Sequence, residues 1–343
     1  MASIFRPGTV DLSLMHRCLE AHKLSADNLL PMLPHGRNAV VGKETRQLYF
    51  NLAVTEAGQF NATPELRGES LGSVRDLLPT TRLIGFGECN VACPYCKRDC
   101  QFIDSDGNVI AAVDVALSSL FALAEGAVDR GEIVRFSGGD PVTRPRETLA
   151  IAAYLWERHG AKVSIAHNGS GRAWAKKLAP YLSSAAIDLK AVPEKIGGIM
   201  GLEKESLGER FFKLSLETQK IVTDAGALLD VRTPVFGDTP IAEMRRLGEH
   251  IAANDLSRTF WTWRMYKKVQ GCSWTVPEKE AIFEMMREVS ADFPKLWMGV
   301  RAKWQRGGMV YLREGRILNS AEAAKITDSE KSGSGNFTVV DEF

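Results

Sequence analysis

The chain has 343 residues, of which 45% are hydrophobic and 25% are charged, and its formal net charge is +1. This composition is that of a globular protein long enough for one large barrel-type domain. A net charge near zero creates no whole-protein field that would attract nucleic acid or an anionic membrane, so we expect neither as a partner. No apolar run approaches the roughly 20 residues that span a bilayer, and Met1–Val10 lacks the apolar core of a secretory signal. We therefore expect a cytoplasmic protein.

Residues 1–80 are predicted to form an N-terminal appendage. They contain one clear amphipathic stretch, Leu12–Leu24, followed by an irregular segment rich in Pro, Gly and Asn. The sequence of this appendage contains no motif that identifies a ligand. We interpret it as a possible substrate-binding or lid region.

From about Thr81, short apolar runs alternate with segments of helical period, which is typical of strand-helix units around a parallel sheet. The predicted strands are Arg82–Gly87, Ile133–Ser137, Lys162–Ala166, Ala185–Leu189, Leu228–Val235 and Thr259–Met265. The predicted helices are Val113–Asp129, Arg146–His159, Arg172–Leu182, Gly208–Ala225, Ile241–Asn254 and Glu278–Phe293. We predict an α/β fold, a partial (β/α)6 TIM-type barrel over residues 81–295, with a doubly wound sheet as the alternative.

Residues 296–343 are predicted to form a short C-terminal β extension. Trp297–Lys303 and Met309–Leu318 have the pattern of short strands, and the second contains a turn at Glu314-Gly315. The tail from Ser329 has a Ser/Gly-rich stretch and is expected to be mobile.

A cysteine cluster follows directly after the first predicted barrel strand. Four of the six cysteines fall at Cys89, Cys93, Cys96 and Cys100, which suggests metal rather than a disulfide scaffold. Soft sulfur ligands select zinc, copper(I) or iron-sulfur, and a cubane held by three cysteines leaves one iron open to a ligand. A zinc knuckle is the alternative, but the chain has neither a second C-x2-C pair nor a nearby histidine. Cys100 is a fourth ligand, a redox-labile neighbour or a bystander, and we favour the bystander.

The spacing Cys89-x3-Cys93-x2-Cys96, with the aromatic Tyr95 before the last cysteine, resembles the radical S-adenosylmethionine (SAM) superfamily. The resemblance implies that the three cysteines hold a [4Fe-4S] cluster and that its free iron chelates SAM. It further implies that one electron cleaves SAM to methionine and a 5′-deoxyadenosyl radical, which abstracts hydrogen from a substrate.

Two later strand ends add to this resemblance. The second strand ends in a run similar to the family's Gly-Gly-Glu-Pro motif, whose backbone and acid receive the SAM ammonium; the residues are Gly138, Gly139, Asp140 and Pro141. The third strand ends in Ala166-His-Asn-Gly-Ser170, which implies that Asn168 lies near the cofactor. For His167 we favour a satisfied core or rim histidine.

The remaining strand ends resemble the pyruvate formate-lyase activating enzymes. The fourth carries Asp188 and Lys190, which the resemblance places at the SAM carboxylate and ribose, with a buried salt pair as the alternative. On the fifth strand, Arg232 either holds an anion or pairs with an acid such as Asp188. On the sixth, Lys267 stands where the family has a ribose-contacting histidine, so that contact is an open point.

The resemblance covers about Leu83–Met265. Cys18 and Cys272 are isolated, so a second cluster like that of peptide-modifying and sulfur-inserting relatives is not expected. The leading hypothesis is an enzyme acting on a small metabolite, such as a sugar, nucleoside or amino acid, in a biosynthetic pathway. The alternatives are a glycyl-radical activase acting on a protein partner and a non-catalytic iron-sulfur or zinc protein. The family's need for a low-potential electron implies flavodoxin or ferredoxin as donor.

Overall fold

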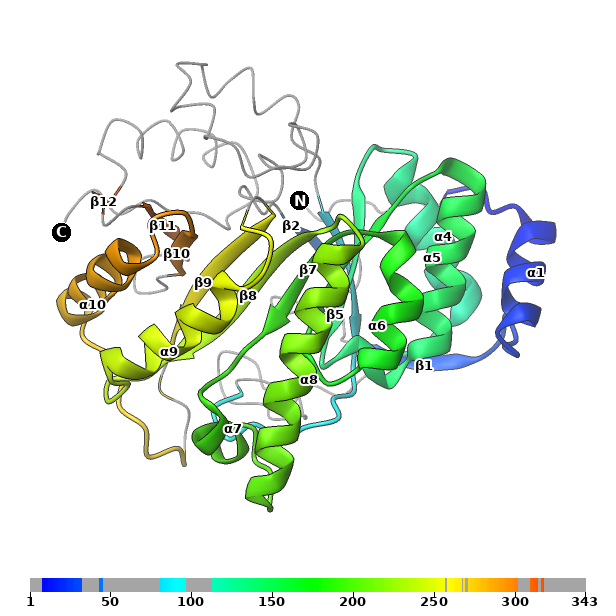
Figure 1. The fold of residues 1–343 in the computed structure, drawn as a ribbon. Coiled ribbons are helices and arrows are strands. Elements are labelled where there is room, and N and C mark those ends of the chain that lie inside the picture. Colours follow the sequence, from blue (N-terminus) through cyan, green and yellow to red (C-terminus); the bar gives the residue numbers. More distant parts are fainter. Residues whose placement is uncertain are drawn as a thin grey trace, which may run out of the picture.

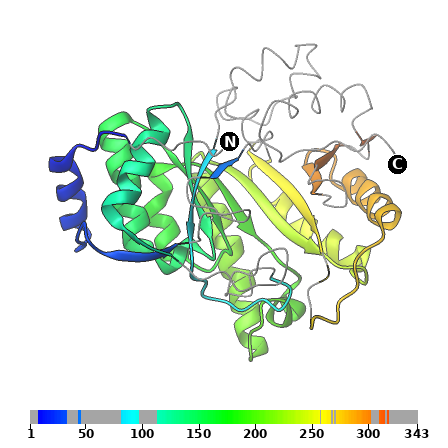
Figure 2. The ribbon, with the colours of Figure 1, turned by 180° about the vertical axis from the view of Figure 1, so that it is seen from behind.

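The computed structural model describes residues 8–32, 43–45, 81–96, 113–256, 258–266, 268, 271–301, 309–313 and 316–317. The chain folds around one twisted sheet in the order β12-β11-β10-β9-β8-β7-β6-β5-β3-β1-β4, with β2 (Lys43–Thr45) paired to β3. Figure 1 shows this sheet with helices in front of it, and Figure 2 shows it from behind.

The centre of the sheet is parallel. Its strands are β3 (Thr81–Phe86), β5 (Ile133–Gly138), β6 (Val163–His167), β7 (Leu182–Asp188), β8 (Leu228–Val235), β9 (Thr259–Met265) and β10 (Trp297–Arg301). Among the described residues the outermost strands of the order, β4 and β12, do not pair, so the sheet is open. The predicted α/β fold with a partial barrel is confirmed, and β10 adds a parallel strand to the six that the sequence predicts.

The crossover helices cover one face of this sheet (Figures 1 and 2). They are α4 (Leu117–Val128), α5 (Pro145–His159), α6 (Arg172–Leu178), α7 (Pro193–Ile199), α8 (Glu205–Asp224), α9 (Ile241–Ala252) and α10 (Lys279–Asp292). Short 3-10 helices η2 (Pro141–Thr143) and η3 (Ala179–Tyr181) follow β5 and α6. Because each helix returns the chain to the start of the next strand, the carboxyl ends of the parallel strands meet at one edge.

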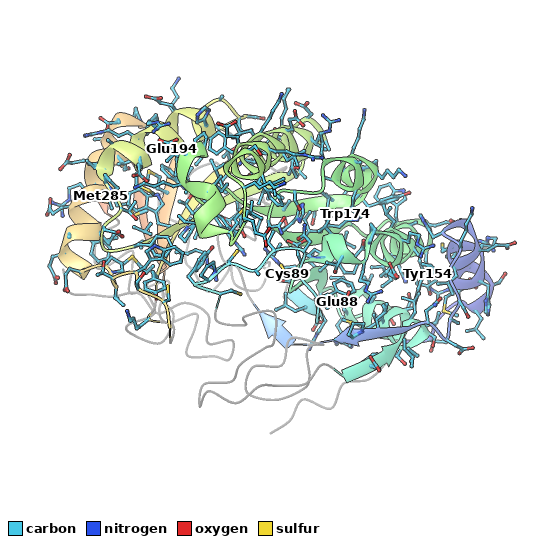
Figure 3. All side chains as sticks on the ribbon, turned by 90° about the horizontal axis from the view of Figure 1, so that it is seen from below. Glu88, Cys89, Tyr154, Trp174, Glu194 and Met285 are labelled. Atoms are coloured by element: carbon cyan, nitrogen blue, oxygen red, sulfur yellow. The ribbon has the colours of Figure 1, made fainter. Side chains whose placement is uncertain are left out.

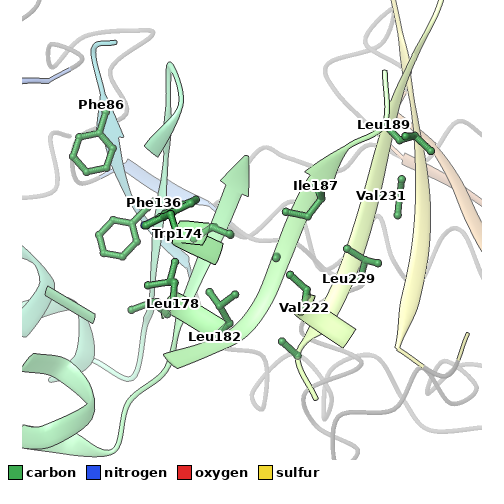
Figure 4. Packing of buried hydrophobic residues seen from close by; sticks show 14 of the residues in the cluster. Phe86, Phe136, Trp174, Leu178, Leu182, Ile187, Leu189, Val222, Leu229 and Val231 are labelled. Carbon is green, nitrogen blue, oxygen red and sulfur yellow. The ribbon is translucent and has the colours of Figure 1, made fainter. Parts of the chain in front are cut away.

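The apolar core fills the space between the sheet and the helices. Phe136 pairs in register with Ile165, and Ile187 pairs with Val231, which in turn pairs with Trp261; all are buried. Figure 4 shows this packing from Phe86 and Phe136 through Leu182 and Ile187 to Leu229. Successive side chains of a strand point to opposite faces, so the residues between these apolar positions face away from the helices.

The N-terminal segment joins the outer edge of this fold. Helix α1 (Leu12–Ala21) packs on α5, with Leu14, Met15, Cys18 and Leu19 buried. Asp11 caps the helix by accepting a hydrogen bond from Leu14 N at 2.9 Å. β1 (Leu29–Met32) then pairs antiparallel with β3 and with β4 (Val113–Ala116). β2 pairs antiparallel with β3, and residues 1–7, 33–42 and 46–80 of the predicted appendage lie outside the described residues.

An ion-pair group fixes this segment near the carboxyl ends of α4 and α5. Arg158 bonds the buried Glu125 and donates to the Thr9 carbonyl at 3.1 Å, and it lies 3.4 Å from Asp11. His159 Nε2 lies 2.9 Å from the same Glu125 carboxylate. The described part of the appendage is therefore attached to the helix layer, at the helix ends away from the strand carboxyl edge.

The structure corrects two of the predicted helix boundaries and adds a short helix. Val113–Ala116 is a strand rather than the start of a helix, because its residues pair with β1; the helix begins at Leu117. The helix predicted over Arg172–Leu182 ends at Leu178, where Pro180, which has no backbone N–H, is followed by the start of β7. The short helix α7 was not predicted. At the C-terminus, β11 (Met309–Arg313) and β12 (Arg316–Ile317) form the expected antiparallel pair.

Candidate metal and cofactor site

The cysteine loop, residues 87–96, leaves the carboxyl end of β3. Cys93 is buried, whereas Cys89 and Cys96 are partly exposed, and Cys96 N donates to the Cys93 carbonyl at 2.9 Å. That bond closes a tight turn through Pro94 and Tyr95. Figure 3, seen from below, places Cys89 in the middle of the molecule, between Tyr154 near α1 and Met285 on α10. The three predicted ligands therefore share one loop at the edge where the parallel strands end.

Two glycines at the end of β5 allow this loop to pack closely. Gly139 N donates to Phe86 O at 2.7 Å, and Asp140 N donates to Glu88 O at 2.7 Å. A Cβ on Gly139 would lie 1.9 Å from Glu88 O, and Gly138 has a φ of +110°. The glycine pair thus fits β5 against the start of the cysteine loop. A contact of these two residues with SAM stays a prediction.

The far side of the loop rests on the turn after α7. A Cβ on Gly201, whose φ is +68°, would lie 2.2 Å from Ala92 O. Figures 1 and 2 both show the stretch after β3, in cyan, running beside α7. The cysteine loop is therefore supported by backbone from both sides.

Asp140 is buried behind the loop, and protein groups surround its carboxylate. Oδ1 accepts from Val142 N at 2.9 Å and lies 2.7 Å from His167 Nδ1, and Oδ2 accepts from Asn168 N at 2.7 Å. Gly171 N donates to His167 Nε2 at 2.9 Å, so both ring nitrogens are satisfied. The interpretation of His167 as a satisfied core residue is confirmed. Asp140 acts here by holding the end of β6; its predicted contact with the SAM ammonium stays untested.

Pro141, the last residue of the predicted Gly-Gly-Asp-Pro motif, is buried and opens the 3-10 helix η2. Its fixed φ suits the first position of such a turn, and its missing N–H needs no partner there. Pro141 therefore shapes the chain after Asp140.

Asn168 bonds the cysteine loop directly. Its Nδ2 donates to Asn90 Oδ1 at 2.7 Å, and Asn90 Nδ2 donates to Ser170 Oγ at 2.9 Å. Ser170 Oγ donates in turn to Asn168 Oδ1 at 2.7 Å. The structure thus brings Asn168 to the residue that follows Cys89; its place near the cofactor stays a prediction.

A second side-chain contact ties the other end of the loop to β7. Lys190 Nζ donates to Tyr95 Oη at 3.0 Å and to Asp188 Oδ2 at 2.7 Å. Of the two alternatives for Asp188 and Lys190, the structure shows the salt pair, and Lys190 of that pair contacts the cysteine loop through Tyr95. Their predicted contact with SAM remains untested.

The charges around this pair determine its protonation. Burial alone would lower the pKa of Lys190, but the Asp188 carboxylate outweighs it and holds that pKa well above its usual value. Burial would raise the pKa of Asp188, but Lys190, Arg232 and Arg264 hold it below its usual value. Burial raises the pKa of Tyr95, so the phenol is neutral when it accepts the Lys190 hydrogen bond. The pair is charged at neutral pH.

Arg232 pairs with an acid on its own strand. Its Nε donates to Asp230 Oδ2 at 2.6 Å, and Thr262 Oγ1 donates to Asp230 Oδ1 at 2.5 Å. In register, Arg232 lies between Asp188 and Thr262, so the three share one face of the sheet. Of the two roles considered for Arg232, the structure shows pairing with an acid, Asp230. Lys267 lies outside the described residues.

Aromatic residues close the site around Tyr95. The Tyr95 ring lies 5.5 Å from that of Phe236 and 5.9 Å from that of Trp274, and Phe236 lies 5.2 Å from Tyr266. The two contacts of Tyr95 are edge-to-face, a geometry that stabilises both partners beyond their burial. The cluster joins the cysteine loop to the ends of β8 and β9.

Sequence reasoning missed several of these residues. Asn90 and Ser170 are polar neighbours of predicted site residues, and only that position in the sequence could have indicated a role for them. Asp230 lies two residues before Arg232, a spacing that puts both on one face of a strand and could have suggested the pair. Trp274 lies in a loop for which the sequence offers no pattern.

The residues fit an iron-sulfur cluster. Cysteine sulfurs are the soft donors that such clusters use, and two of the three side chains are partly exposed on a loop held by backbone contacts. Among the described residues, the compact group of possible metal ligands is Glu125, Asp129 and His159, and no cysteine belongs to it. The described part of the cysteine loop offers three thiolates as donors, and Cys100 lies outside the described residues.

No protein-family model matches the chain, and no curated protein sequence matches it. Among solved structures it is similar to a radical SAM methyltransferase from Sphaerobacter thermophilus, with a TM-score of 0.48 and 15% identity over 65% of this chain and 66% of that one. It is similar to SuiB from Streptococcus suis bound to S-adenosylmethionine, with a TM-score of 0.49 and 14% identity over 65% and 51% of the two chains. A domain of pyruvate-formate lyase-activating enzyme from Bacteroides vulgatus matches with a TM-score of 0.39 and 14% identity over 49% and 98%.

The matched region spans less than two thirds of the first two of these proteins. At such identities and TM-scores the likenesses assign neither a reaction nor a substrate to this chain. In the described part of the chain, no helix is both long enough and apolar enough to cross a membrane.

Proposed function

We propose that this chain is a radical SAM enzyme that holds a [4Fe-4S] cluster through Cys89, Cys93 and Cys96. The observation that carries the proposal is the placement of these cysteines on one loop at the carboxyl edge of an open parallel sheet. Ligands of parallel α/β folds bind at that edge. When bound there, the cluster and SAM supply one-electron cleavage of SAM and a 5′-deoxyadenosyl radical for hydrogen abstraction.

The chain's own residues orient the site. Asp140 holds the backbone of Asn168, and Asn168 holds the loop beside Cys89. Lys190 holds Tyr95 beside Cys96. Aromatic side chains pack around Tyr95 on that side of the loop, where they would limit the access of water to a reactive species.

The proposed substrate is a small metabolite such as a sugar, nucleoside or amino acid, taken from a cytoplasmic pool. The support for a small metabolite is that the sequence has no second cysteine cluster, such as peptide-modifying and sulfur-inserting relatives carry. A low-potential flavodoxin or ferredoxin is the proposed electron donor. The second candidate, a glycyl-radical activase, is favoured by the Asp188–Lys190 pair, which matches the element of those enzymes.

Anaerobic reconstitution with iron and sulfide, followed by dithionite and SAM, tests the class. We expect 5′-deoxyadenosine by mass spectrometry from the wild type and none from Cys93→Ala. Cys272→Ala is the matched control and should behave as the wild type. Wild-type protein that loads a reducible cluster and never cleaves SAM, with or without candidate substrates, would contradict the proposal.

Two further experiments separate the alternatives. Cys100→Ala should leave the SAM response of the cluster unchanged, whereas loss of the cluster in this variant would favour a closed four-cysteine electron-transfer site. For the activase, the discriminating result is a stable complex with a glycyl-radical enzyme and the appearance of a glycyl radical by electron paramagnetic resonance. Turnover of a metabolite without any protein partner would support the leading candidate.

A further inference from the structure

A closed ring of hydrogen bonds joins the cysteine loop to the end of β6. Asn168 Nδ2 donates to Asn90 Oδ1 (2.7 Å), Asn90 Nδ2 donates to Ser170 Oγ (2.9 Å), and Ser170 Oγ donates to Asn168 Oδ1 (2.7 Å). Each of the three side chains both donates and accepts. Each hydrogen bond therefore orients a side chain so that it can form the next hydrogen bond of the ring.

The ring has one rigid anchor. Asn168 is 5% exposed, its backbone N–H is bound by the buried Asp140 carboxylate, and Ser170 N donates to its side chain at 3.0 Å. Asn90, by contrast, is exposed. An isolated hydrogen bond from an exposed amide contributes little because water replaces it. A ring closed on a buried anchor holds the exposed residue in one orientation.

Asn90 directly follows Cys89, the first of the three cysteines and one of the two that are partly exposed. The Cys96 end of the loop is held separately, through Tyr95 and Lys190. On the other side of Cys89, Glu88 forms an ion pair with Arg144, with side chains 46% and 26% exposed, and its carbonyl accepts a hydrogen bond from Asp140 N at 2.7 Å. The ring adds a side-chain contact that holds the residue directly after Cys89 to the end of β6.

We propose that Asn90, with Ser170, is a positioning residue that presets the Cys89 thiol for metal binding. This inference rests on the proposed function in one respect, namely that the three cysteines bind metal. It requires neither SAM nor catalysis. A preset loop loses less conformational entropy when a metal binds, so the metal affinity of the loop reports the effect of the ring.

The test is anaerobic titration of the cluster-free full chain with Co²⁺, followed by the thiolate-to-cobalt absorption. We expect Asn90→Ala to bind Co²⁺ about tenfold more weakly than the wild type, since it removes two hydrogen bonds of the ring. Ser170→Ala should show a similar loss. The double variant should be no weaker than either single variant, because one break opens the whole ring. Ser170→Thr retains the hydroxyl and should restore the affinity.

Asn254→Ala is the matched control. It also removes two side-chain hydrogen bonds, to Gln219 and to Ile251 O, but it lies before β9, at the opposite end of the strands. It should leave the Co²⁺ affinity unchanged. Urea unfolding of each variant shows whether the fold is intact.

The outcomes are distinct. Equal Co²⁺ affinity of the wild type and a folded Asn90→Ala variant would overturn the positioning role while leaving the proposed function in place. Additive losses in the double variant would also overturn it, because they would show two independent contacts. A wild-type chain that binds no Co²⁺ through its cysteines would overturn the metal site itself.

Discussion

Asp140 Oδ1 lies 2.7 Å from His167 Nδ1, and this contact fixes the tautomer of the histidine. Gly171 N–H donates to Nε2, so Nε2 carries no proton and Nδ1 donates to Asp140. With Val142 N and Asn168 N as further donors, both oxygens of Asp140 accept hydrogen bonds from the protein. The carboxylate thereby links the end of β5 to the end of β6, behind the cysteine loop.

Replacing Asp140 by Asn should lower the free energy of unfolding by about 2 kcal/mol. An amide has one acceptor and one donor, so in either orientation its NH₂ faces an N–H group, of His167 or of Asn168. Urea unfolding measures the loss. Asp224→Asn, at an exposed ion pair with Lys220, is the control and should change the stability by less than about 0.5 kcal/mol. If Asp140→Asn changes the free energy of unfolding as little as this control does, the Asp140 carboxylate does not accept these hydrogen bonds.

Gly139 should not tolerate a side chain. Its Cβ would lie 1.9 Å from Glu88 O, which is backbone and cannot move aside without displacing the cysteine loop. We expect Gly139→Ala to cost about 3 kcal/mol in urea unfolding. Gly198→Ala is the control, because nothing lies within 4 Å of its Cβ and alanine favours helix α7. It should leave the stability unchanged or raise it slightly, and equal costs in the two variants would refute the close approach.

The sequence predicts the central strands and the cysteine loop because both signals are local. Buried parallel strands are continuous apolar runs, and three cysteines within eight positions need no partner elsewhere to be recognised. Val113–Ala116 was predicted as helix because its strand character depends on β1, more than 80 residues earlier in the chain. Pairing of that kind has no local pattern.

The polar contacts of the site were only partly predictable. Asp188 and Lys190 were recognised because their spacing places both on one strand face. The ring through Asn90, Asn168 and Ser170 depends on two chain segments that meet only when β3 and β6 lie in one sheet. Single asparagines and serines are common in loops for reasons of their own, so their presence alone indicates no contact.

The Asp188–Lys190 pair should give a defined acid dependence. Because the folded state lowers the pKa of Asp188, the pair stabilises the fold fully at pH values above the usual carboxyl pKa of about 4. This stabilisation is lost as the pH falls through the lower pKa of the folded state. Wild type and Asp188→Asn should therefore differ most in unfolding free energy at pH 6, and the difference should shrink between pH 4 and pH 3. A difference independent of pH would contradict the assigned charge of Asp188.

At the start of β3, Arg82 and Glu132 form a buried two-pronged ion pair. Arg82 Nε and Nη2 donate to the two Glu132 oxygens at 2.9 and 2.7 Å, and the side chains are 7% and 9% exposed. Burial would raise the pKa of Glu132, but Arg82 and Arg130 hold it below its usual value. Removing one partner of a buried ion pair is strongly destabilising, so Glu132→Ala should lower the free energy of unfolding by about 3 kcal/mol.

The exposed pair Lys220–Asp224, one helical turn apart on α8, is the control for this variant. Lys220→Ala should change the free energy of unfolding by less than about 0.5 kcal/mol. The stabilisation by Glu132 is present above its usual pKa of about 4 and is lost as the pH falls through the lower folded-state value. Urea unfolding at pH 7 and pH 3.5 should therefore show Glu132→Ala approaching the wild type in acid.

Because Glu132 lies at the opposite end of β3 from the cysteine loop, the same variant should retain the Co²⁺ affinity of the wild type. A large loss of that affinity in folded protein would show that the two ends of the strand are coupled.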